Sequence, residues 1–433
     1  MSNYIDLINW LTSNNCTVHP SIQVEESAAD EKLRGLYSTG HVDTNTVLCT
    51  IPSDLVISIN NKCLQPFNNL GIPEYVRLTL WLCNESIQKE QSQYYQWCQL
   101  MPIYHDIQHN SIVQQRMKLT ALLDDTTLQT ALVSRSDELY DIYMHVYQYY
   151  CNQQNDHDSN NTDQHWFSKI SFEHFCQADY SIWSRVLGLP DTSNNGTQQH
   201  KLALIPYIDL CNHTNDESSL NCRWEYNTTD DSVSLISTQP IPQSTQLYIS
   251  YGNKSNTELL YLYMFALDDN QYDNCSIPLD IKSAIQHKPH DIMIQCITLI
   301  RKLHLNSMIT IECDGEYSID SWIVSSIIAC NTAEQIESIN NVYDAQSNNE
   351  SESTDKITWN HSTALQQFDS TVLYNARGLL LNIVKQYRNN LPDTRKYNMS
   401  DTIKRYATYY VQGELRVLNE CIDKYSDIAV NTK

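Results

Sequence analysis

The sequence predicts an α+β protein in which a β module, a helical insert, a second β module and a mainly helical module follow one another. Short apolar runs that are broken by proline or glycine occur in the first 60 residues and again between residues 200 and 252. Apolar residues at the three- and four-residue spacing of helices fill residues 73–150 and the chain from residue 289 onward. Because single cores stop growing at roughly 250 to 300 residues, the 433 residues predict more than one domain.

The first module begins with a helix. Apolar side chains at three- and four-residue spacing predict an amphipathic helix over residues 4–14. Two apolar runs, at 47–51 and 55–59, are separated by Pro52 and predict short strands. The helical pattern of residues 73–150 then predicts the insert.

The second β module contains a hairpin, a strand and the start of a helix. Residues 222–227 and 232–237 flank a turn and predict the hairpin. An alternating segment that ends at Gly252 predicts a further strand with two faces. Ser255 and Glu258 have the spacing of a capping box, so a helix is expected to begin there.

The last part of the chain is expected to be mainly helical. A turn at Asp314-Gly315 interrupts the helical pattern and favours a two-residue hairpin loop. Three polar tracts, at residues 152–165, 191–200 and 345–356, cannot bury enough apolar surface to order themselves and predict loops.

Charge and cysteine content limit the partners and the compartment. The 51 acidic and 28 basic residues give a net charge of −23, which disfavours nucleic acid and anionic membranes and favours a basic protein partner. Acidity that only maintains solubility is the alternative. Fourteen cysteines occur singly without zinc-ligand spacing, so we expect no metal and reduced thiols. With no signal peptide or membrane-spanning run recognisable, the sequence predicts an intracellular protein.

Most common catalytic signatures are missing from the sequence. It contains no G-x-S-x-G, H-E-x-x-H, phosphate-binding loop or G-x-G-x-x-G motif, which disfavours hydrolase, NTPase and dinucleotide-binding functions. His105 and His109 share a helical spacing but lack a third ligand nearby, so they are interpreted as a surface pair.

Two segments remain as candidates for a site. The run "LALIPYIDLCNH" ends with Asp209, Asn212 and His213, and "YISYGNKSN" places Tyr251 where a predicted strand ends. Taken alone, the first segment is explained by polar side chains that satisfy a short helical turn after Pro206 and by a hydrogen-bonded core histidine. The second segment changes this balance because functional residues gather where strands end in loops.

Together these segments resemble the paired signature of SET-domain protein methyltransferases, in particular the subfamily related to Rubisco large-subunit lysine methyltransferase. "LRGLYSTGHV" is similar to the family's N-terminal cofactor loop, and "ADYSIWSRVLGL" is similar to its arginine-bearing segment. The resemblance covers nearly the whole chain. It implies a SET-type fold of short sheets over residues 1–270, with the helical insertion at about 73–180. An α-helical substrate-binding domain is expected over 271–433.

The resemblance implies S-adenosylmethionine as the cofactor and a role for each matching residue. Tyr251 is expected to align the target amine as the catalytic residue, and Tyr207 and Tyr251 are expected to bind the substrate. The residues expected to bind the cofactor are Gly35, Glu85, Arg185, Asn212, His213, Tyr251 and Phe265. Methyl transfer to an amine mainly requires two positioned reactants, which agrees with the absence of metal-ligand spacing.

The sequence departs from the family pattern where Leu33 and Met264 replace glycines, and a lost glycine can obstruct a ligand's approach to the backbone. Three functions are therefore weighed. Methylation of a lysine in a basic protein, such as a ribosomal protein or histone, ranks first. Histidine methylation ranks lower because Val186-Leu187 follow Arg185, where that branch of the family has a polar pair. The third is a catalytically silent binding scaffold. We expect a monomer in the cytoplasm or nucleus.

Overall fold

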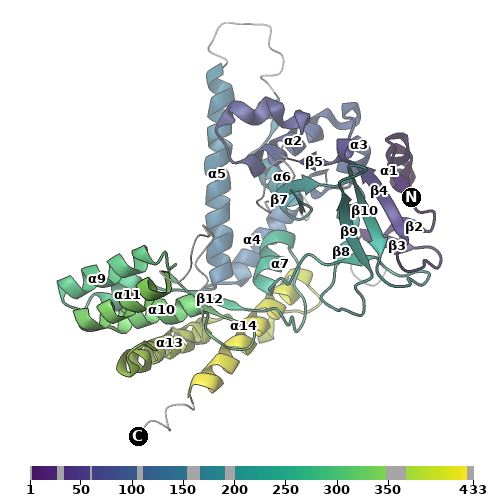
Figure 1. Ribbon diagram of the computed structural model, residues 1–433. Helices are drawn as coiled ribbons and strands as arrows, with labels where there is room; N and C mark the ends of the chain where they lie inside the picture. The colour runs from purple at the N-terminus through teal and green to yellow at the C-terminus, as the bar shows by residue number, and fades with distance from the viewer. Residues whose placement is uncertain are drawn as a thin grey trace. The chain divides into compact units, whose positions relative to one another are not determined.

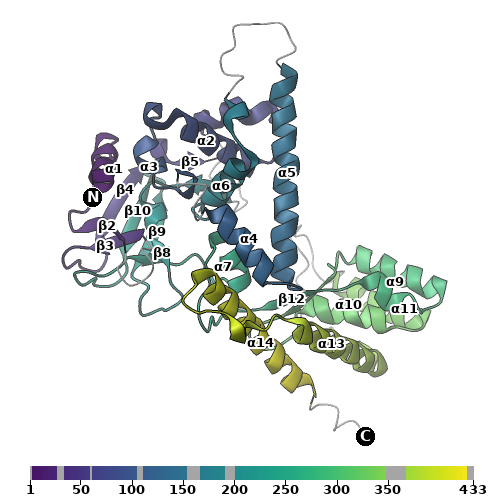
Figure 2. The ribbon, with the colours of Figure 1, turned by 180° about the vertical axis from the view of Figure 1, so that it is seen from behind.

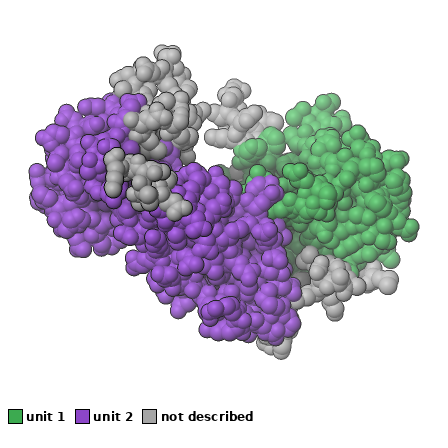
Figure 3. Space-filling model, turned by 90° about the horizontal axis from the view of Figure 1, so that it is seen from below, with its two compact units in different colours: residues 1–118, 132–254, 261–264 green, residues 119–131, 255–260, 265–433 purple. Residues whose placement is uncertain are grey.

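The computed structural model describes residues 2–26, 34–58, 61–104, 111–153, 166–190, 200–347 and 367–426 (Figure 1). The chain divides into two compact units. The first contains residues 1–118, 132–254 and 261–264, and the second contains residues 119–131, 255–260 and 265–433 (Figure 3). Leu33, His105 and His109 lie outside the described residues, as do almost all positions of the three polar tracts.

The N-terminal part of the first unit is a helix followed by short strands. The predicted first helix is confirmed as α1 (Ser2–Ser13), and its Leu7 and Leu11 are fully buried. The elements that follow are β1 (Thr17–Val18), β2 (Ile22–Glu26), β3 (Arg34–Ser38), β4 (Val47–Pro52), η1 (Ser53–Leu55) and β5 (Ile57–Ser58). The strand predicted at 55–59 is shorter than expected, because the Val56 N–H donates to the Ser53 carbonyl and closes a 3-10 turn.

Helices form the middle of the chain, as the apolar spacing predicts. They are η2 (Lys62–Leu70), α2 (Glu74–Gln88), η3 (Lys89–Gln91), α3 (Tyr95–Cys98), η4 (Pro102–Tyr104), α4 (Ile112–Leu122), α5 (Thr127–Gln153), η6 (Phe167–Lys169) and α6 (Phe172–Trp183). Within the first unit, α2 and α6 lie to one side of the long helix α5 when it is seen from the front and from behind (Figures 1 and 2). A buried ion pair ties α5 to α6, since Arg135 Nη2 lies 2.8 Å from Asp179 Oδ2.

Short strands close the first unit. They are β6 (Leu187–Pro190), β7 (His200–Leu204), β8 (Asn212–His213), β9 (Cys222–Asn227), β10 (Ser232–Ser237) and β11 (Tyr248–Ile249), with the 3-10 turn η7 (Ile208–Leu210) before β8. The predicted hairpin is confirmed as β9 and β10, and the sheet order is β1-β4-β10-β9. The strand predicted to end at Gly252 is shorter, because β11 ends at Ile249.

The sheets bring distant segments together. β2 pairs with β3, and β7 lies between β5 and β6. β11 runs parallel to β8, with Tyr248 opposite Asn212 and Ile249 opposite His213. The two candidate segments of the sequence are therefore neighbours in space.

The second unit is mainly helical. Its elements after residue 265 are β12 (Cys275–Pro278), α8 (Ile281–Ile285), α9 (His290–Lys302), β13 (Met308–Ile311), α10 (Ile319–Ala329), α11 (Ala333–Ser347), α13 (Ser370–Asn390), η9 (Thr394–Lys396) and α14 (Thr402–Ser426). β12 and β13 form an antiparallel pair. Gly315 occupies the predicted turn with φ +76°, but the Glu312 N–H donates to the Glu316 carbonyl, so the loop has three residues, 313–315, and not the two expected.

The helix α7 (Asn256–Tyr263) begins with the predicted capping box. The Ser255 N–H donates to the Glu258 carboxylate at 3.1 Å, and the Glu258 N–H lies 3.4 Å from the Ser255 hydroxyl. Residues 119–131 and 255–260 belong to the second unit, because Thr127 donates to the Ser276 carbonyl and Asn256 binds Asp273. The domain boundary near residue 270 stays a prediction. Within the described ranges, no helix combines the length and apolar character needed to cross a bilayer.

Candidate active site

A strained turn leads into the Asn-His segment. Tyr207 has φ +71° and ψ −47°, and the Ile208 N–H donates to the Pro206 carbonyl at 2.9 Å, which closes a three-residue γ-turn. A γ-turn with positive φ is rare and costs conformational energy, and such strain persists only where the surroundings enforce it. The Tyr207 ring is fully buried and its hydroxyl donates to the Ile22 carbonyl at 3.4 Å. Substrate binding by Tyr207 stays a prediction.

The turn after Tyr207 carries Asp209, which holds Arg185. Arg185 Nη1 lies 3.1 Å from Asp209 Oδ2 and donates to the Asp209 carbonyl at 3.0 Å. Trp97 Nε1 donates to the same carboxylate oxygen at 3.1 Å. The Asp209 side chain has no exposed surface. Burial raises the pKa of Asp209, and the Arg185 charge opposes this rise. Asp209, whose role the sequence leaves open, therefore orients the arginine.

Gly35 and Asn212 lie against each other. Asn212 Nδ2 donates to the Arg34 carbonyl at 3.0 Å, which places the amide over β3. A Cβ at position 35 would lie 2.9 Å from Asn212 Nδ2 and 2.5 Å from Gln246 Nε2. Only glycine leaves room for both amides, so the structure brings two predicted cofactor-binding residues together.

Gln246 is a site residue that the sequence analysis missed. Its Oε1 accepts hydrogen bonds from the hydroxyls of Tyr37 at 2.9 Å and Tyr248 at 2.8 Å. Its Nε2 therefore points toward Gly35. The only signal in the sequence is its position two residues before Tyr248 on the same strand face, and this spacing is too common to identify a site.

Three buried polar atoms of this cluster have no hydrogen-bond partner among the described residues. They are Arg185 Nε, Asp209 Oδ1 and Gln246 Nε2. Buried polar groups are nearly always hydrogen-bonded, so each unsatisfied group requires an explanation. Two donors and one acceptor beside the close approach at Gly35 fit a polar ligand that carries both acceptors and donors.

Tyr251 connects the two signature segments. Its hydroxyl donates to the Cys211 carbonyl at 2.7 Å, and its N–H donates to His213 Nδ1 at 3.1 Å. The Tyr251 ring stacks on the His213 ring, with centroids 5.0 Å apart and an angle of 17°. The Tyr251 ring also packs against the Tyr263 ring, with centroids 4.7 Å apart and an angle of 32° between the ring planes. One hydrogen bond of the hydroxyl and two ring contacts thus fix the orientation of its phenol.

Burial keeps the central groups of this cluster neutral. It raises the pKa of Tyr251 far above its ordinary value of 10, and the nearby Arg185 charge only partly offsets this rise. Burial lowers the pKa of His213 below its ordinary 6.5. At pH 7 the phenol is protonated and the imidazole is uncharged, so Tyr251 can donate a hydrogen bond but cannot serve as a general base.

This architecture matches a known family. A family model described as "SET domain" matches residues 33–252, which is more than half of the chain. The chain belongs to the SET-domain family. The SET fold is also found in the solved structure of Rubisco LSMT bound to AdoMet, with a TM-score of 0.68 at 15% identity over 98% of this chain and 92% of that one.

Two relatives extend the comparison of this SET-domain chain. It is 24% identical over 298 residues to the ribosomal lysine N-methyltransferase set10 of Schizosaccharomyces pombe, which covers 65% of this chain and 49% of that relative. It is 30% identical over 115 residues to the actin-histidine N-methyltransferase of Homo sapiens, covering 27% of this chain and 18% of that protein. The matches thus span about half of the first relative's length and less than a fifth of the second's.

Other predicted residues of the SET domain make their contacts elsewhere. Glu85, on α2, accepts a hydrogen bond from the Ser92 hydroxyl, and its carbonyl accepts one from the Tyr104 hydroxyl at 3.0 Å. Burial raises the pKa of Glu85. These contacts close a local turn and do not join Glu85 to Asn212, so its ribose-binding role stays a prediction.

The residue that follows α7 is one of the two departures from the family pattern. Met264 is buried and has φ +63°, a left-handed conformation that glycine adopts without strain. The aromatic ring on Tyr251 belongs to Tyr263, which the sequence analysis did not assign. Phe265 is half-buried and belongs to the second unit, and its role as a cofactor wall stays a prediction.

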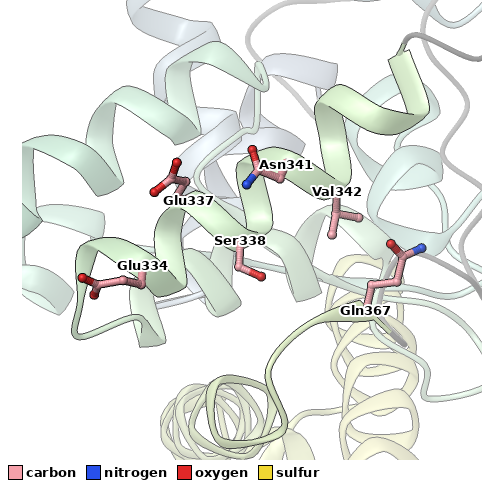
Figure 4. Close-up of a pocket in the computed structure, with 6 residues that line it drawn as sticks. All are labelled: Glu334, Glu337, Ser338, Asn341, Val342 and Gln367. Atoms are coloured by element: carbon pink, nitrogen blue, oxygen red, sulfur yellow. The ribbon is translucent and has the colours of Figure 1, made fainter.

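A separate hollow of about 400 Å³ lies in the second unit beside α11 (Figure 4). The residues that line it are Glu334, Glu337, Ser338, Asn341, Val342 and Gln367. None of the predicted site residues lines this hollow, so it is distinct from the cluster around Tyr251.

Proposed function

We propose that this SET-domain protein is an S-adenosylmethionine-dependent protein-lysine methyltransferase. The observation that carries the proposal is the fixed phenol of Tyr251, bound to the Cys211 carbonyl and stacked on His213, beside the Asn212–Gly35 contact. Because the hydroxyl proton is donated to Cys211, the phenol oxygen remains as an acceptor for an N–H of the amine, which leaves the nitrogen lone pair free to attack.

The residues around Gly35 fit the cofactor. The unsatisfied Arg185 Nε and Gln246 Nε2 are donors suited to carboxylate or hydroxyl oxygens, and Asp209 Oδ1 is an acceptor. Arg185, Asn212 and Gln246 would therefore hold it, with Gly35 making room for the two amides along β3. When bound, S-adenosylmethionine would supply a methyl group on a sulfonium sulfur: the neutral amine nitrogen would bond to the methyl carbon as the carbon–sulfur bond breaks, and the thioether would leave with that electron pair.

The protein's own task is to position a neutral lysine. Free lysine has a pKa of about 10.4, so deprotonation near pH 7 costs roughly 4 to 5 kcal/mol. Burial in an apolar environment lowers this cost because it disfavours the charged ammonium. The stacked rings of His213, Tyr251 and Tyr263 provide such surroundings, and neither His213 nor Tyr251 carries a compensating negative charge at pH 7.

The substrate we propose is a basic protein, and ribosomal proteins and histones rank first. The similarity to a ribosomal lysine methyltransferase and the net charge of −23 support this class. We also propose that the protein acts as a monomer in the cytoplasm or nucleus. The thirteen cysteines whose side chains the structure describes are free, which supports a reducing compartment. The similarity to actin-histidine methyltransferases supports histidine as the second candidate target.

Radiolabelled S-adenosylmethionine tests the proposal directly. We expect the purified full chain to label ribosomal proteins or histones, and Tyr251→Phe to abolish the label. Tyr374→Phe, at an exposed position of α13, is the matched control and should label normally. Mass spectrometry of the labelled protein then identifies the residue. Label on histidine would replace lysine as the target, and absence of both labelling and cofactor binding would favour a silent scaffold.

A further inference from the structure

Helix α5 exposes an unusual set of large apolar side chains. Val133 is 46% exposed, Tyr140 50% and Tyr147 40%. The three positions are seven residues apart, so they lie along one face of the 27-residue helix. We call them the α5 stripe. Exposed apolar residues are ordinary when scattered singly, whereas a row along one face of a helix forms a continuous apolar surface of the kind that marks an interaction site.

The core does not account for the α5 stripe. Leu132, Leu139 and Val146 already supply a buried apolar row at the same seven-residue spacing, and Leu139 and Val146 belong to the core of the first unit. The stripe occupies the neighbouring position on each turn and remains exposed. Folding of the first unit therefore requires the inner row, and the outer row needs another explanation.

Ring contacts hold the stripe in a defined orientation. The Tyr140 ring packs edge-on against Phe172, with centroids 5.3 Å apart, and the Tyr147 ring stacks on Tyr143 at 6.2 Å. Tyr143 also contacts Phe172 at 5.6 Å, which makes the four rings continuous. Rings that are already held lose little conformational entropy when a partner binds, so such a surface is favourable for association.

The charges beside the stripe are negative. Asp137 and Asp141 are exposed on the same helix and have no ion-pair partner within the described ranges. Arg135 is the only arginine or lysine among residues 132–150 of α5. It is buried and already paired with Asp179 and Glu138, at 2.8 and 2.9 Å. The exposed side of α5 therefore offers apolar rings bordered by carboxylates.

We propose that the α5 stripe is a docking surface for an amphipathic helix of a basic protein, with aliphatic residues at heptad spacing and lysine or arginine beside them. Charge complementarity selects this occupant over a second copy of the chain. Two copies would each carry a net charge of −23 and would bring Asp137 and Asp141 of both helices together. The stripe shares no residue with the Tyr251 cluster, and its test requires no methyl transfer.

A synthetic 21-residue peptide with leucine at heptad positions and flanking lysines tests this inference. Fluorescence anisotropy should detect binding to the full chain, and the triple variant Val133→Ser/Tyr140→Ser/Tyr147→Ser should weaken it at least about tenfold. Asp137→Lys/Asp141→Lys should also weaken binding. A matched triple variant at scattered exposed positions, Ile5→Ser/Ile294→Ser/Tyr374→Ser, should bind like the wild type. A peptide with glutamate in place of lysine should not bind.

Two results would overturn the inference. One is equal affinity of the wild type and the α5 stripe variant for the lysine peptide. The other is a dimer of the wild type in sedimentation equilibrium that the stripe variant abolishes, which would assign the surface to a second copy. Thermal unfolding shows whether each variant is folded, and Tyr140→Phe/Tyr147→Phe, which keeps the rings, should retain binding.

Discussion

The phenolic hydroxyl of Tyr251 donates a hydrogen bond of 2.7 Å to the main-chain carbonyl of Cys211. This bond joins Tyr251, two residues after β11, to the residue before β8, and the two are 40 positions apart in the chain. The bond also orients the hydroxyl proton. Burial raises the Tyr251 pKa, so this proton stays on the phenol oxygen at pH 7. The phenol oxygen therefore remains as an acceptor that positions an N–H of the amine in the proposed reaction.

Tyr251→Phe should lower the rate of methyl transfer by about 100-fold, because one preorganised hydrogen-bonding group is lost while the ring contacts remain. Single-turnover labelling measures the rate, and calorimetry measures cofactor affinity, which should change little. Tyr263→Phe keeps its ring on Tyr251 and is the matched control. A large loss of cofactor affinity in Tyr251→Phe would assign this hydroxyl to the cofactor.

Asp209→Asn should destabilise the first unit by about 3 to 5 kcal/mol, because it leaves the Arg185 guanidinium buried without its counter-charge. Urea unfolding measures the effect. Glu225→Gln removes one partner of the exposed Arg223–Glu225 pair and should cost less than about 1 kcal/mol. Equal effects of the two substitutions would contradict a structural role for the buried pair.

Gly35→Ala should cost about 1 to 3 kcal/mol and weaken cofactor binding, because the new methyl group displaces the amides of Asn212 and Gln246. Gly40→Ala is the matched control, since the nearest atom to its added Cβ would be 3.5 Å away. Calorimetry with S-adenosylmethionine and thermal unfolding measure the two effects. Unchanged affinity would place the cofactor away from β3.

The stability of the second unit should depend on pH through Glu414. This residue of α14 is buried and accepts a hydrogen bond from the Tyr387 hydroxyl at 3.1 Å, and burial raises its pKa to about 7. The folded state then holds the proton more tightly than the unfolded state, whose pKa is near 4.5. Its contribution to stability is complete below about pH 4.5, falls as pH rises, and levels off above about 7.

Glu414→Gln should therefore stabilise the protein at pH 8 by up to about 3 kcal/mol and have little effect at pH 4.5. Denaturant unfolding at the two pH values measures this difference. Glu420→Gln, on the exposed side of the same helix, should leave the pH dependence unchanged. Buried Asp273, whose pKa burial raises to about 6, adds a slope of the same sign that both variants retain.

Local patterns in the sequence predicted the elements whose cause is local. The spacing of Leu7 and Leu11 predicted α1, and Ser255 with Glu258 predicted the start of α7. The proximity of "IDLCNH" and "YISYG" could also be predicted from the sequence, because the resemblance to a known family connected two segments that periodicity alone could not join.

Contacts between residues far apart in the chain could not be predicted from the sequence. Asp209 meets Trp97 across 112 residues, and Gln246 meets Tyr37 across 209. No local pattern marks either partner. The positive φ of Tyr207 and Met264 was also missed, because neither tyrosine nor methionine favours that conformation and the surrounding fold imposes it.

The parallel pair β8–β11 contains only two residues in each strand. A pair this short has no stability of its own, so its amide hydrogens exchange with solvent only as fast as the surrounding structure opens. We therefore expect Asn212, His213 and Tyr251 to lose their mutual contacts together when the surrounding structure opens. Hydrogen exchange at Ile249 and loss of cofactor affinity should follow one cooperative transition, so a partly denatured sample would be a mixture of fully competent and wholly inactive molecules.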